Sequence, residues 1–327
     1  MMNILTNRRK NPKSALGARE TGSYGGQPLH TQDVNVWMKT NAKHIEHALA
    51  ALLPSDYDQS TRLSEAMRYA TLQGGKRTRA LLTQAAGALN DTPAPLLHGI
   101  GAAIEMMHAC TLVHDDLPAM DDDVLRRGLP TVHVKFDEAT AILVGDALQA
   151  HAFLTLTQLA IPAENRIALV QELARAVSTE GAAGGQAIDL ALVGKSVPLD
   201  HIIKMHAMKS GALVRASVRM GVLCTVIDDD EHRELYEALD RYSASFGLAL
   251  QVIDDILDAT EDTATLGKTA GKDAAAQKPT CASLMGIAAA RSLASDLFHE
   301  AETAITPLGP RAEKLAQLIA LAAKRLP

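Results

Sequence analysis

Two clusters of aspartates are the residues of this chain best suited to chemistry. The first, within TLVHDDLPAMDDDVLRRG (111–128), places five aspartates within nine positions. The second, within QVIDDILDATEDTATLGK (251–268), places three aspartates inside an apolar helical window. Carboxylates this close repel one another and raise one another's pKa, and a bound divalent cation removes that cost. Ligand sets made only of oxygen favour Mg²⁺.

The spacing within each cluster predicts which carboxylates share a site. Asp254 and Asp258 are four residues apart, so one helical face presents both. Asp115 and Asp121 are six apart, and a continuous helix would point them in divergent directions. Pro118 opposes continuation of the helix, so the chain can loop outward and return Asp121 toward Asp115. We therefore expect two metal sites, one for each cluster.

A third acidic run, IDDDEHRELYEAL (227–239), serves as an internal comparison. Its aspartates precede an amphipathic helix, where they suit an N-cap and a first turn. We interpret this run as structural. The other two clusters differ because they interrupt apolar patterns.

Basic residues predict the ligand that the metals would serve. Magnesium held by carboxylates alone generally binds a phosphorylated ligand, whose oxygens complete the coordination. The stretch GGKRTRA (74–80) places Lys76, Arg77 and Arg79 at a helix start, where backbone N–H groups also favour an anion. Arg126 and Arg127 closely follow the first aspartate cluster. Two phosphate sites are indicated, one reached through metal and one through Lys and Arg alone.

The elements that would position these residues are helices. Aromatic residues make up only 3% of the chain, and apolar residues recur at spacings of three and four. We expect an all-α single domain over 31–327, after a flexible extension over 1–30. The predicted helices cover 34–53, 62–73, 76–90, 95–116, 138–160, 164–182, 200–224, 230–260, 281–305 and 311–325. The stretch 101–114 is apolar nearly all round, which indicates a helix enclosed by others.

Composition excludes several classes of protein. A net charge of −6 over 327 residues, without a large basic block, argues against nucleic-acid binding. The three cysteines form no CxxC pair, which suits a reducing cytoplasm. No continuous apolar run approaches the ~18 residues that cross a bilayer, so we expect a cytoplasmic protein without a transmembrane segment.

The order of the motifs resembles that of the trans-isoprenyl diphosphate synthase, or polyprenyl synthetase, family. The chain contains GGKRxR, DDxxxxD followed by LRRG, GGQxxD, KxGAL, QxxDDxLD and GK, over roughly residues 35–326. The stretch 112–136 is most similar to bacterial farnesyl diphosphate synthases. The resemblance implies the isoprenoid synthase fold, a bundle of about ten or more helices around a deep central cavity. It also implies a homodimer with three Mg²⁺ ions at each active site when diphosphate is bound.

The resemblance assigns roles to individual residues. It implies that isopentenyl diphosphate and an allylic diphosphate are the substrates, and that Gln186 and Asp189 lie on a helix facing the cavity. The implied metal ligands are Asp115 and Asp121, with Asp116 in support, together with Asp254 and Asp258. The implied ligands of isopentenyl diphosphate are Lys76, Arg79, His108 and Arg127. The residues implied around the allylic diphosphate and the reacting carbons are Arg126, Lys209, Ser210, Gln251 and Lys268.

The helix that enters the first cluster should set the length of the product. Met107, Cys110, Thr111 and His114 share a broad face of that helix. Bacterial farnesyl synthases commonly have an aromatic residue at the position of Cys110, where it closes the cavity. The smaller cysteine leaves room for several methylenes. Farnesyl diphosphate is therefore the first expectation for the product, and geranylgeranyl diphosphate is the second.

Two alternative functions belong to other classes of protein. A class I terpene cyclase shares the first acidic motif but needs no site for isopentenyl diphosphate, and Lys76, Arg79 and Arg127 argue against it. A non-catalytic partner subunit would be expected to lack one acidic motif, whereas both are complete here. The motifs therefore favour an active prenyltransferase.

Overall fold

The structure is a computed structural model that describes residues 34–55, 61–225, 230–261 and 277–326. Residues Asp33–Pro327 form one compact unit. The predicted N-terminal extension, the start of the third acidic run and Lys268 lie outside the described residues.

The described residues are almost entirely helical, which confirms the predicted all-α class. A short hairpin joins Leu125–Arg126 (β1) to Leu129–Pro130 (β2) in antiparallel pairing. In the first half of the chain the helices are α1 (Val34–Leu52), α2 (Thr61–Leu72), α3 (Thr78–Gly87), α4 (Ala94–Asp115), α5 (Val132–Lys135), α6 (Glu138–Thr157) and α7 (Ala163–Val177). In the second half they are α8 (Ala182–Leu192), α9 (Leu199–His206), α10 (Ala212–Val222), α11 (Asp230–Thr260), α14 (Cys281–Met285), α15 (Ile287–Ile305) and α16 (Glu313–Ala323).

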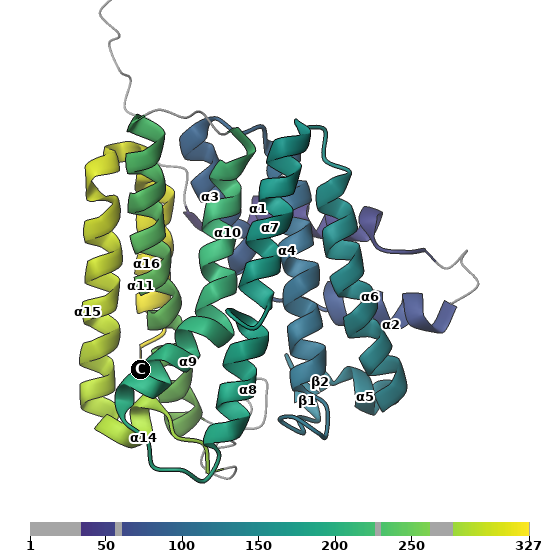
Figure 1. Cartoon of the computed structure of the whole chain (residues 1–327), viewed down its shortest axis with the longest axis vertical. Coiled ribbons are helices and arrows are strands. Elements are labelled where there is room, and N and C mark those ends of the chain that lie inside the picture. The colour runs from purple at the N-terminus through teal and green to yellow at the C-terminus, as the bar shows by residue number, and fades with distance from the viewer. Residues whose placement is uncertain (1–33, 56–60, 226–229, 262–276, 327) are drawn as a thin grey trace, which may run out of the picture. The chain divides into compact units, whose positions relative to one another are not determined.

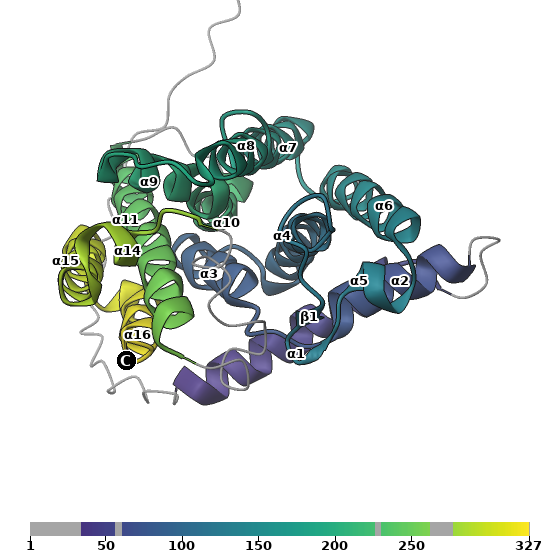
Figure 2. The same ribbon diagram turned by 90° about the horizontal axis from the view of Figure 1, so that it is seen from below.

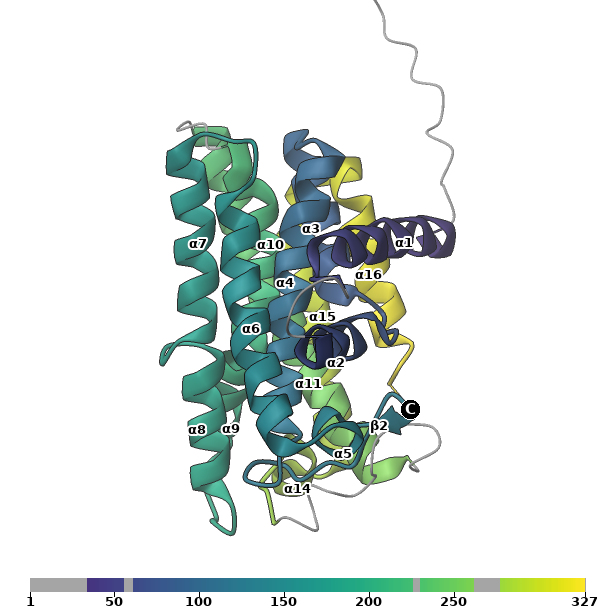
Figure 3. The same ribbon diagram turned by 90° about the vertical axis from the view of Figure 1, so that its right-hand side faces the viewer.

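Most of the long helices run side by side, and the first two cross them. Figure 1 shows α4, α6, α7, α10, α11 and α15 nearly parallel to one another, and Figure 2 shows the same helices end-on, with α3 and α10 between α4 and α11. Figure 3 shows α1 and α2 lying across this bundle. The arrangement encloses α4 on several sides, as its apolar sequence predicts.

The two helices that bear the acidic motifs are each packed into a separate hydrophobic cluster. One cluster includes Val252 and Ile256 of α11 with α15 and α16, and the other includes Met106 and Val113 of α4 with α1 and α6. Burying each large aliphatic side chain stabilises the fold by about 1.5–3 kcal/mol. Each aspartate cluster thus stands at the end of a helix that is fixed by its own packed core.

The structure differs from the predicted helices at four places. The predicted helix 200–224 contains a π-helical turn at Ala207–Gly211, and the helix predicted over 164–182 ends at Val177. Helix α8 was not among the predicted ranges, because its two adjacent glycines have low helix propensity. The range 281–305 is interrupted at Gly286, which has a φ of 81°.

Two helices, α4 and α6, are both long and strongly apolar. By length and composition alone, α4 and α6 could cross a membrane, although Glu105 and Asp146 interrupt their apolar sequences. The apolar window of α4 is 67% buried inside the bundle, whereas that of α6 is only 44% buried. Enclosure by the bundle accounts for the composition of α4, and the exposed face of α6 requires a different explanation.

Candidate active site

The first acidic cluster is a helix end followed by a loop that folds back. Helix α4 stops at Asp115, and the backbone N–H of Asp121 donates to the Asp115 carbonyl at 2.9 Å. The N–H of Asp123 returns to the carbonyl of Asp116 at 3.1 Å. The loop after Pro118 therefore brings Asp121 back beside Asp115, as the proline predicts.

Burial and like charge act together on Asp115. Desolvation is the largest cause that raises the pKa of its carboxyl to about 6, and the neighbouring carboxylates of Asp121 and Asp116 add to it. Lys209 and Arg126 oppose the shift without cancelling it. The site therefore holds a carboxylate whose charge is only partly compensated by the protein, which is the electrostatic setting that favours a cation.

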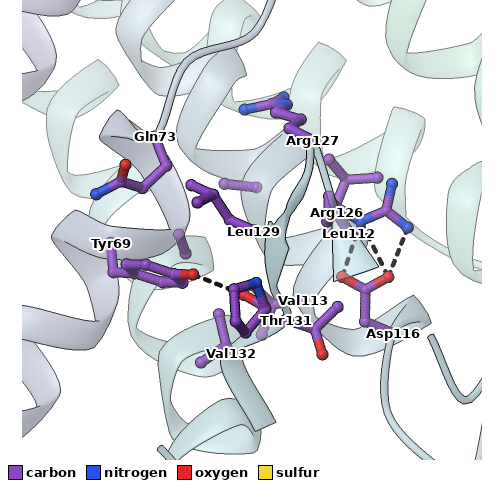
Figure 4. Close-up of a pocket in the computed structure, with 13 residues that line it drawn as sticks. Tyr69, Gln73, Leu112, Val113, Asp116, Arg126, Arg127, Leu129, Thr131 and Val132 are labelled. Carbon is purple, nitrogen blue, oxygen red and sulfur yellow. Dashed lines mark hydrogen bonds and ion pairs between the residues drawn. The ribbon is translucent and has the colours of Figure 1, made fainter. Parts of the chain in front are cut away.

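Asp116 points away from this pair. Its two carboxylate oxygens accept from Arg126, whose Nε lies 2.9 and 2.8 Å from Oδ1 and Oδ2. Figure 4 shows the two side chains facing each other at the edge of a small pocket of about 40 Å³, with Tyr69 on the other side. Arg126 occupies the oxygens that a metal would need. The geometry thus favours an ion pair that fixes the loop over the expected supporting metal ligand.

The two proposed metal ligands of the second acidic cluster differ in exposure. The side chain of Asp254 is 45% exposed and accepts from Arg325 at 2.9 Å, whereas Asp258 is buried. Lys76 lies near both Asp254 and Arg325, and its pKa is lowered by desolvation and by the positive charge of Arg325. Arg325 is a C-terminal residue that no motif in the sequence identified.

The two clusters meet at one cavity of about 150 Å³. Its lining includes Asp121, Asp189, Gln251 and Asp254, and does not include Asp258. Lys278 lies between the clusters, with its Nζ 2.7 Å from Asp121 Oδ1 and 3.0 Å from Asp189 Oδ2. The sequence reading missed Lys278, because only the fold brings it back to the first cluster, 157 positions away.

Lys209 reaches the same cavity from the π-helical turn. Its Nζ donates to Asp189 Oδ2 at 2.6 Å, and nearby carboxylates raise its pKa against the effect of desolvation. A π-helical turn aims its side chains differently from an α-helix and often occurs at functional sites. Ser210, the next residue, lines the adjoining cavity.

Gly185 of α8 packs directly on the backbone of Lys209. A Cβ added at Gly185 would lie 2.2 Å from the Lys209 nitrogen and 2.5 Å from its Cα. The glycine pair in GGQAID is therefore a close-approach site, which explains why a helix with poor propensity forms here.

Replacing Gly185 with alanine should displace the lysine-bearing turn. We expect activity to fall about 10²-fold, since a shift of ~1 Å in a positioning element has that effect, and the free energy of unfolding to fall by about 1–3 kcal/mol. Thermal melting and steady-state kinetics measure both. Gly99→Ala is the control, because its Cβ would meet only the end of the flexible Leu159 side chain; equal losses in both variants would contradict the prediction.

In the basic turn before α3 (residues 74–77), one cationic side chain is buried in the core and another is exposed. Arg77 is buried and pairs with Glu105 at 3.4 Å, so the expectation that it faces an anion was wrong. Lys76 is exposed. Arg127 donates to the Gly74 carbonyl at 2.5 Å and lies against Gly75, where any Cβ would collide with its guanidinium. The turn thus buries Arg77, holds Arg127 against its backbone and leaves Lys76 exposed.

Arg79 and His108 form the third part of this basic group. Arg79 donates to His108 Nε2 at 3.1 Å. Desolvation and the surrounding arginines hold the pKa of His108 well below its usual range, so its imidazole is neutral and accepts this hydrogen bond. The charges of Glu105 and Asp254 partly offset the desolvation of Arg79, so this cationic group lies near the second acidic cluster. The Arg79 guanidinium and the neighbouring arginines suit a phosphate group.

An apolar cavity of about 330 Å³ extends from Asp115 along α4. Met107, Cys110 and Thr111 line it together with His114, and Met107 and Cys110 are buried side chains of the α4 core. Gln186 lines the cavity from α8, and both polar atoms of its amide lack a partner among the described residues. The cavity includes Asp115 at the acidic cluster, and apolar side chains supply the larger part of its wall, so it can hold a chain attached to a diphosphate.

The donor chemistry of the acidic clusters fits Mg²⁺. Among the described residues, the one group of three metal-ligating side chains whose donor atoms lie within 4.8 Å of one another is His206, Asp255 and Cys281. It takes one aspartate of the second cluster, Asp255, which His206 already contacts at 3.0 Å. The clusters instead offer separate carboxylates around a polar cavity. Mg²⁺ usually takes one or two carboxylates and completes its octahedron with phosphate oxygens and water. The clusters therefore suit metal that binds together with a diphosphate.

Comparison with known proteins decides the family. The family model described as polyprenyl synthetase matches residues 60–306. The chain belongs to the polyprenyl synthetase family. It is 71% identical over 304 residues to a probable farnesyl diphosphate synthase of Sinorhizobium fredii, covering 93% of this chain and 90% of that protein. It is 46% identical to the farnesyl diphosphate synthase of Escherichia coli, covering 86% and 94% of the two chains.

A solved structure agrees with the fold of this polyprenyl synthetase. A geranyltransferase of Helicobacter pylori, crystallised with magnesium and isoprenyl diphosphate, superposes with a TM-score of 0.80 at 29% identity over 90% of this chain and 98% of that one. The predicted isoprenoid synthase fold is therefore confirmed, and with it the family that the motif order indicated.

Proposed function

We propose that this protein is a Mg²⁺-dependent short-chain trans-prenyltransferase of the cytoplasm that makes farnesyl diphosphate. Its substrates would be isopentenyl diphosphate and the allylic diphosphates dimethylallyl and geranyl diphosphate. The single observation that carries the proposal is that two cavities meet at Lys209. One is polar and lined by aspartates of both acidic clusters, and the other runs from Asp115 along α4 and is also lined by the cationic pair of Arg79 and His108.

The proposed roles follow that division. Asp115, Asp121 and Asp254 would hold Mg²⁺ with the allylic diphosphate, and Asp258 remains a ligand only if it turns out of its buried position. Lys209 and Gln251 would contact the allylic diphosphate and the reacting carbons, with Ser210 beside them. Arg126 would act by fixing Asp116 unless diphosphate draws it away. The proposed ligands of isopentenyl diphosphate are Lys76, Arg79, His108 and Arg127, and Lys268 keeps the role that its motif implies.

The residues of the chain explain how such a site would promote the reaction. Bound Mg²⁺ would supply charge neutralisation for the leaving diphosphate. Lys209 donates to that diphosphate as its bond to the allylic carbon breaks, which stabilises the developing negative charge. Arg79 and Arg127 hold isopentenyl diphosphate so that its double bond attacks the resulting carbocation in line. The walls formed by Met107 and Cys110 exclude water, and the proton that is lost passes to the departing diphosphate.

Farnesyl diphosphate is favoured as the product by the relatives of the chain. The Sinorhizobium fredii protein, identical at 71% of aligned positions, bears the name of a farnesyl synthase. Cys110 supports geranylgeranyl diphosphate as a second candidate, because a small side chain lines the cavity where an aromatic ring would close it. We expect farnesyl diphosphate as the main product, with a minor product one isoprene unit longer.

Replacing Cys110 with tyrosine should abolish the longer product. The ring would extend into the cavity beside Thr111 and His114 and remove the space for a fourth isoprene unit. Chromatography of the dephosphorylated alcohols measures the ratio of geranylgeraniol to farnesol. Cys110→Ser retains the small side chain and should leave the ratio unchanged. An equal ratio in the tyrosine variant and the original protein would show that this position does not set chain length.

The exposed face of α6 supports a homodimer. Ile142, Leu143 and Leu154 of this helix are 48%, 54% and 48% exposed, an apolar surface on a helix that is otherwise packed on α4. Apolar surface of this kind is typical of an interface between copies. We expect the chain to sediment as a dimer, and Leu143→Glu to shift it to a monomer. A monomeric mass for the unaltered protein at micromolar concentration would contradict this.

Product analysis tests the proposed function. The protein is incubated with Mg²⁺, isopentenyl diphosphate and each allylic primer in turn, and the alcohols are identified after dephosphorylation. Farnesol from both primers, lost on chelation of the metal, is the expected result. Conversion of an allylic diphosphate to a cyclic hydrocarbon without isopentenyl diphosphate would indicate a cyclase, and no product from any primer would indicate a non-catalytic subunit.

A further inference from the structure

A buried junction joins three segments at the wall of the polar cavity. His206 ends α9, Asp255 lies on α11 and Cys281 begins α14. Nε2 of His206 lies 3.0 Å from Asp255 Oδ2, and the backbone N–H of Cys281 donates to the same oxygen at 2.8 Å. All three residues are at most 6% exposed. One carboxylate oxygen thus connects three elements that are distant in sequence.

Each of these segments carries a group of the candidate active site close to the junction. Lys209 follows His206 by three positions, Asp254 precedes Asp255 by one, and Lys278 precedes Cys281 by three. Both lysines reach Asp189 Oδ2, at 2.6 and 3.0 Å. The same three segments therefore form both the junction and part of the polar cavity.

The path from His206 to Lys209 passes through the π-helical turn. A π-turn is rare, because it widens the helix and needs support from its surroundings. Gly185 supports one side of this turn by direct backbone contact with Lys209. His206 stands at the entrance of the turn and is fixed by Asp255. These two contacts determine where the lysine backbone lies.

We propose that His206, through its hydrogen bond to Asp255, is a positioning residue that sets the π-turn and thereby aims Lys209 at the allylic diphosphate. The inference rests on the proposed prenyl transfer and deepens it. In this proposal Asp255 is not a metal ligand, whereas its neighbour Asp254 is. Asp255 anchors α11 to α9 and α14 at the wall of the polar cavity, beside the carboxylates proposed to bind metal.

The same three residues offer an imidazole, a carboxylate and a thiol within 4.8 Å of one another, a donor set that suits Zn²⁺. Two observations favour the anchor over a Zn²⁺ site. The oxygen of Asp255 is already held by the backbone of Cys281 rather than by its thiol, and His206 Nδ1 has no partner among the described residues. Metal-bound histidines usually have such a partner on the second nitrogen. Cys281→Ser keeps the backbone N–H and a hydrogen-bonding side chain, so it should leave the anchor intact.

Variants of His206 test the proposal through a split between kinetic constants. His206→Leu removes the donor, and we expect kcat to fall about 10- to 100-fold with a higher KM for the allylic diphosphate. The KM for isopentenyl diphosphate should stay within about twofold, because Arg79 and His108 lie on other helices. His206→Gln retains an N–H donor and should retain most of the activity. His98→Gln on α4, a histidine with an unpartnered Nε2, is the matched control.

A double variant separates positioning from stability. His206→Leu alone leaves the buried Asp255 charge uncompensated, so the variant should also be less stable. His206→Leu with Asp255→Asn removes that charge and keeps an acceptor for the Cys281 N–H. We expect the melting temperature to recover and the allylic kinetics to remain impaired. Recovery of both, or equal changes in both KM values, would overturn the proposal.

Two further outcomes are distinguishable. Zn²⁺ bound one-to-one by the metal-free protein, and lost in Cys281→Ser, would identify a metal site and overturn the anchor. If the unaltered protein condenses no primer, the proposed function has failed. If the unaltered protein does condense the primers, and His206→Leu has the same kinetic constants, the inference alone has failed.

Discussion

Asp115→Asn is expected to abolish prenyl transfer while making the protein more stable in the absence of metal. The expected loss in kcat/KM is about 10³-fold, because the variant removes a charged ligand that acts on the leaving diphosphate. The gain in stability has a separate origin. Desolvation and neighbouring carboxylates raise the pKa of Asp115 to about 6, so the ionised form is unfavourable in the folded protein.

The pH dependence of this gain has a definite sign. A carboxyl whose pKa is raised by folding destabilises the folded state as pH rises from about 4 to about 6, and the effect is constant above that range. Two pKa units correspond to ~3 kcal/mol, and solvent access at the site lowers this to about 1–3 kcal/mol. The asparagine variant lacks the charge. It should therefore unfold at a higher temperature than the original protein at pH 7.5, and at the same temperature near pH 4.

Melting in buffer with a chelator measures this difference, and addition of Mg²⁺ with inorganic diphosphate should reverse it, since only the original protein gains a ligand. Asp296→Asn on the exposed side of α15 is the control and should change neither property. Full activity in Asp115→Asn, or a lower melting temperature at pH 7.5, would contradict the account.

Arg79→Gln and Lys209→Gln are expected to weaken different substrates. Arg79 belongs to the basic group with His108, and Lys209 to the cavity between the acidic clusters. Loss of a buried charge-assisted contact costs about 2–4 kcal/mol. We therefore expect Arg79→Gln to raise the KM for isopentenyl diphosphate by about 10²-fold, with little change for geranyl diphosphate. Lys209→Gln should do the reverse and also lower kcat, because the lysine stabilises the leaving group.

Initial rates measured over a grid of both substrate concentrations separate the two constants. Lys204→Gln, on the exposed surface of α9, controls for the loss of a lysine near the site. Equal effects of Arg79→Gln on both substrates would mean that the basic group and the acidic clusters serve a single diphosphate. A cyclase, which has no second diphosphate, would give that result.

The sequence predicted the fold class and the position of both acidic clusters because these depend on local rules. The apolar character of 101–114 required a helix enclosed by others, and Pro118 required a loop between Asp115 and Asp121. Both features are set by residues that are neighbours in the chain. The order of the motifs added the family, which the match over residues 60–306 confirmed.

The parts that sequence reasoning missed depend on tertiary contacts. Lys278 and Arg325 reach the acidic clusters only because α11, α14 and α16 fold back over them, and no spacing in the sequence records this. Arg77 was expected to face an anion, yet the buried Glu105 draws it inward. The π-helical turn was missed because no local pattern of residues marks it, and the segments that pack against it, such as Gly185 of α8, are distant in sequence.

One diffraction experiment tests the central claim, that the two acidic clusters hold divalent metal around one diphosphate. Crystals grown with Mn²⁺ and inorganic diphosphate are measured at a wavelength where manganese scatters anomalously. The account predicts anomalous peaks beside Asp115 and Asp121 and beside Asp254, with diphosphate between them in contact with Lys209. Peaks at His206, Asp255 and Cys281 with none at these aspartates would contradict it.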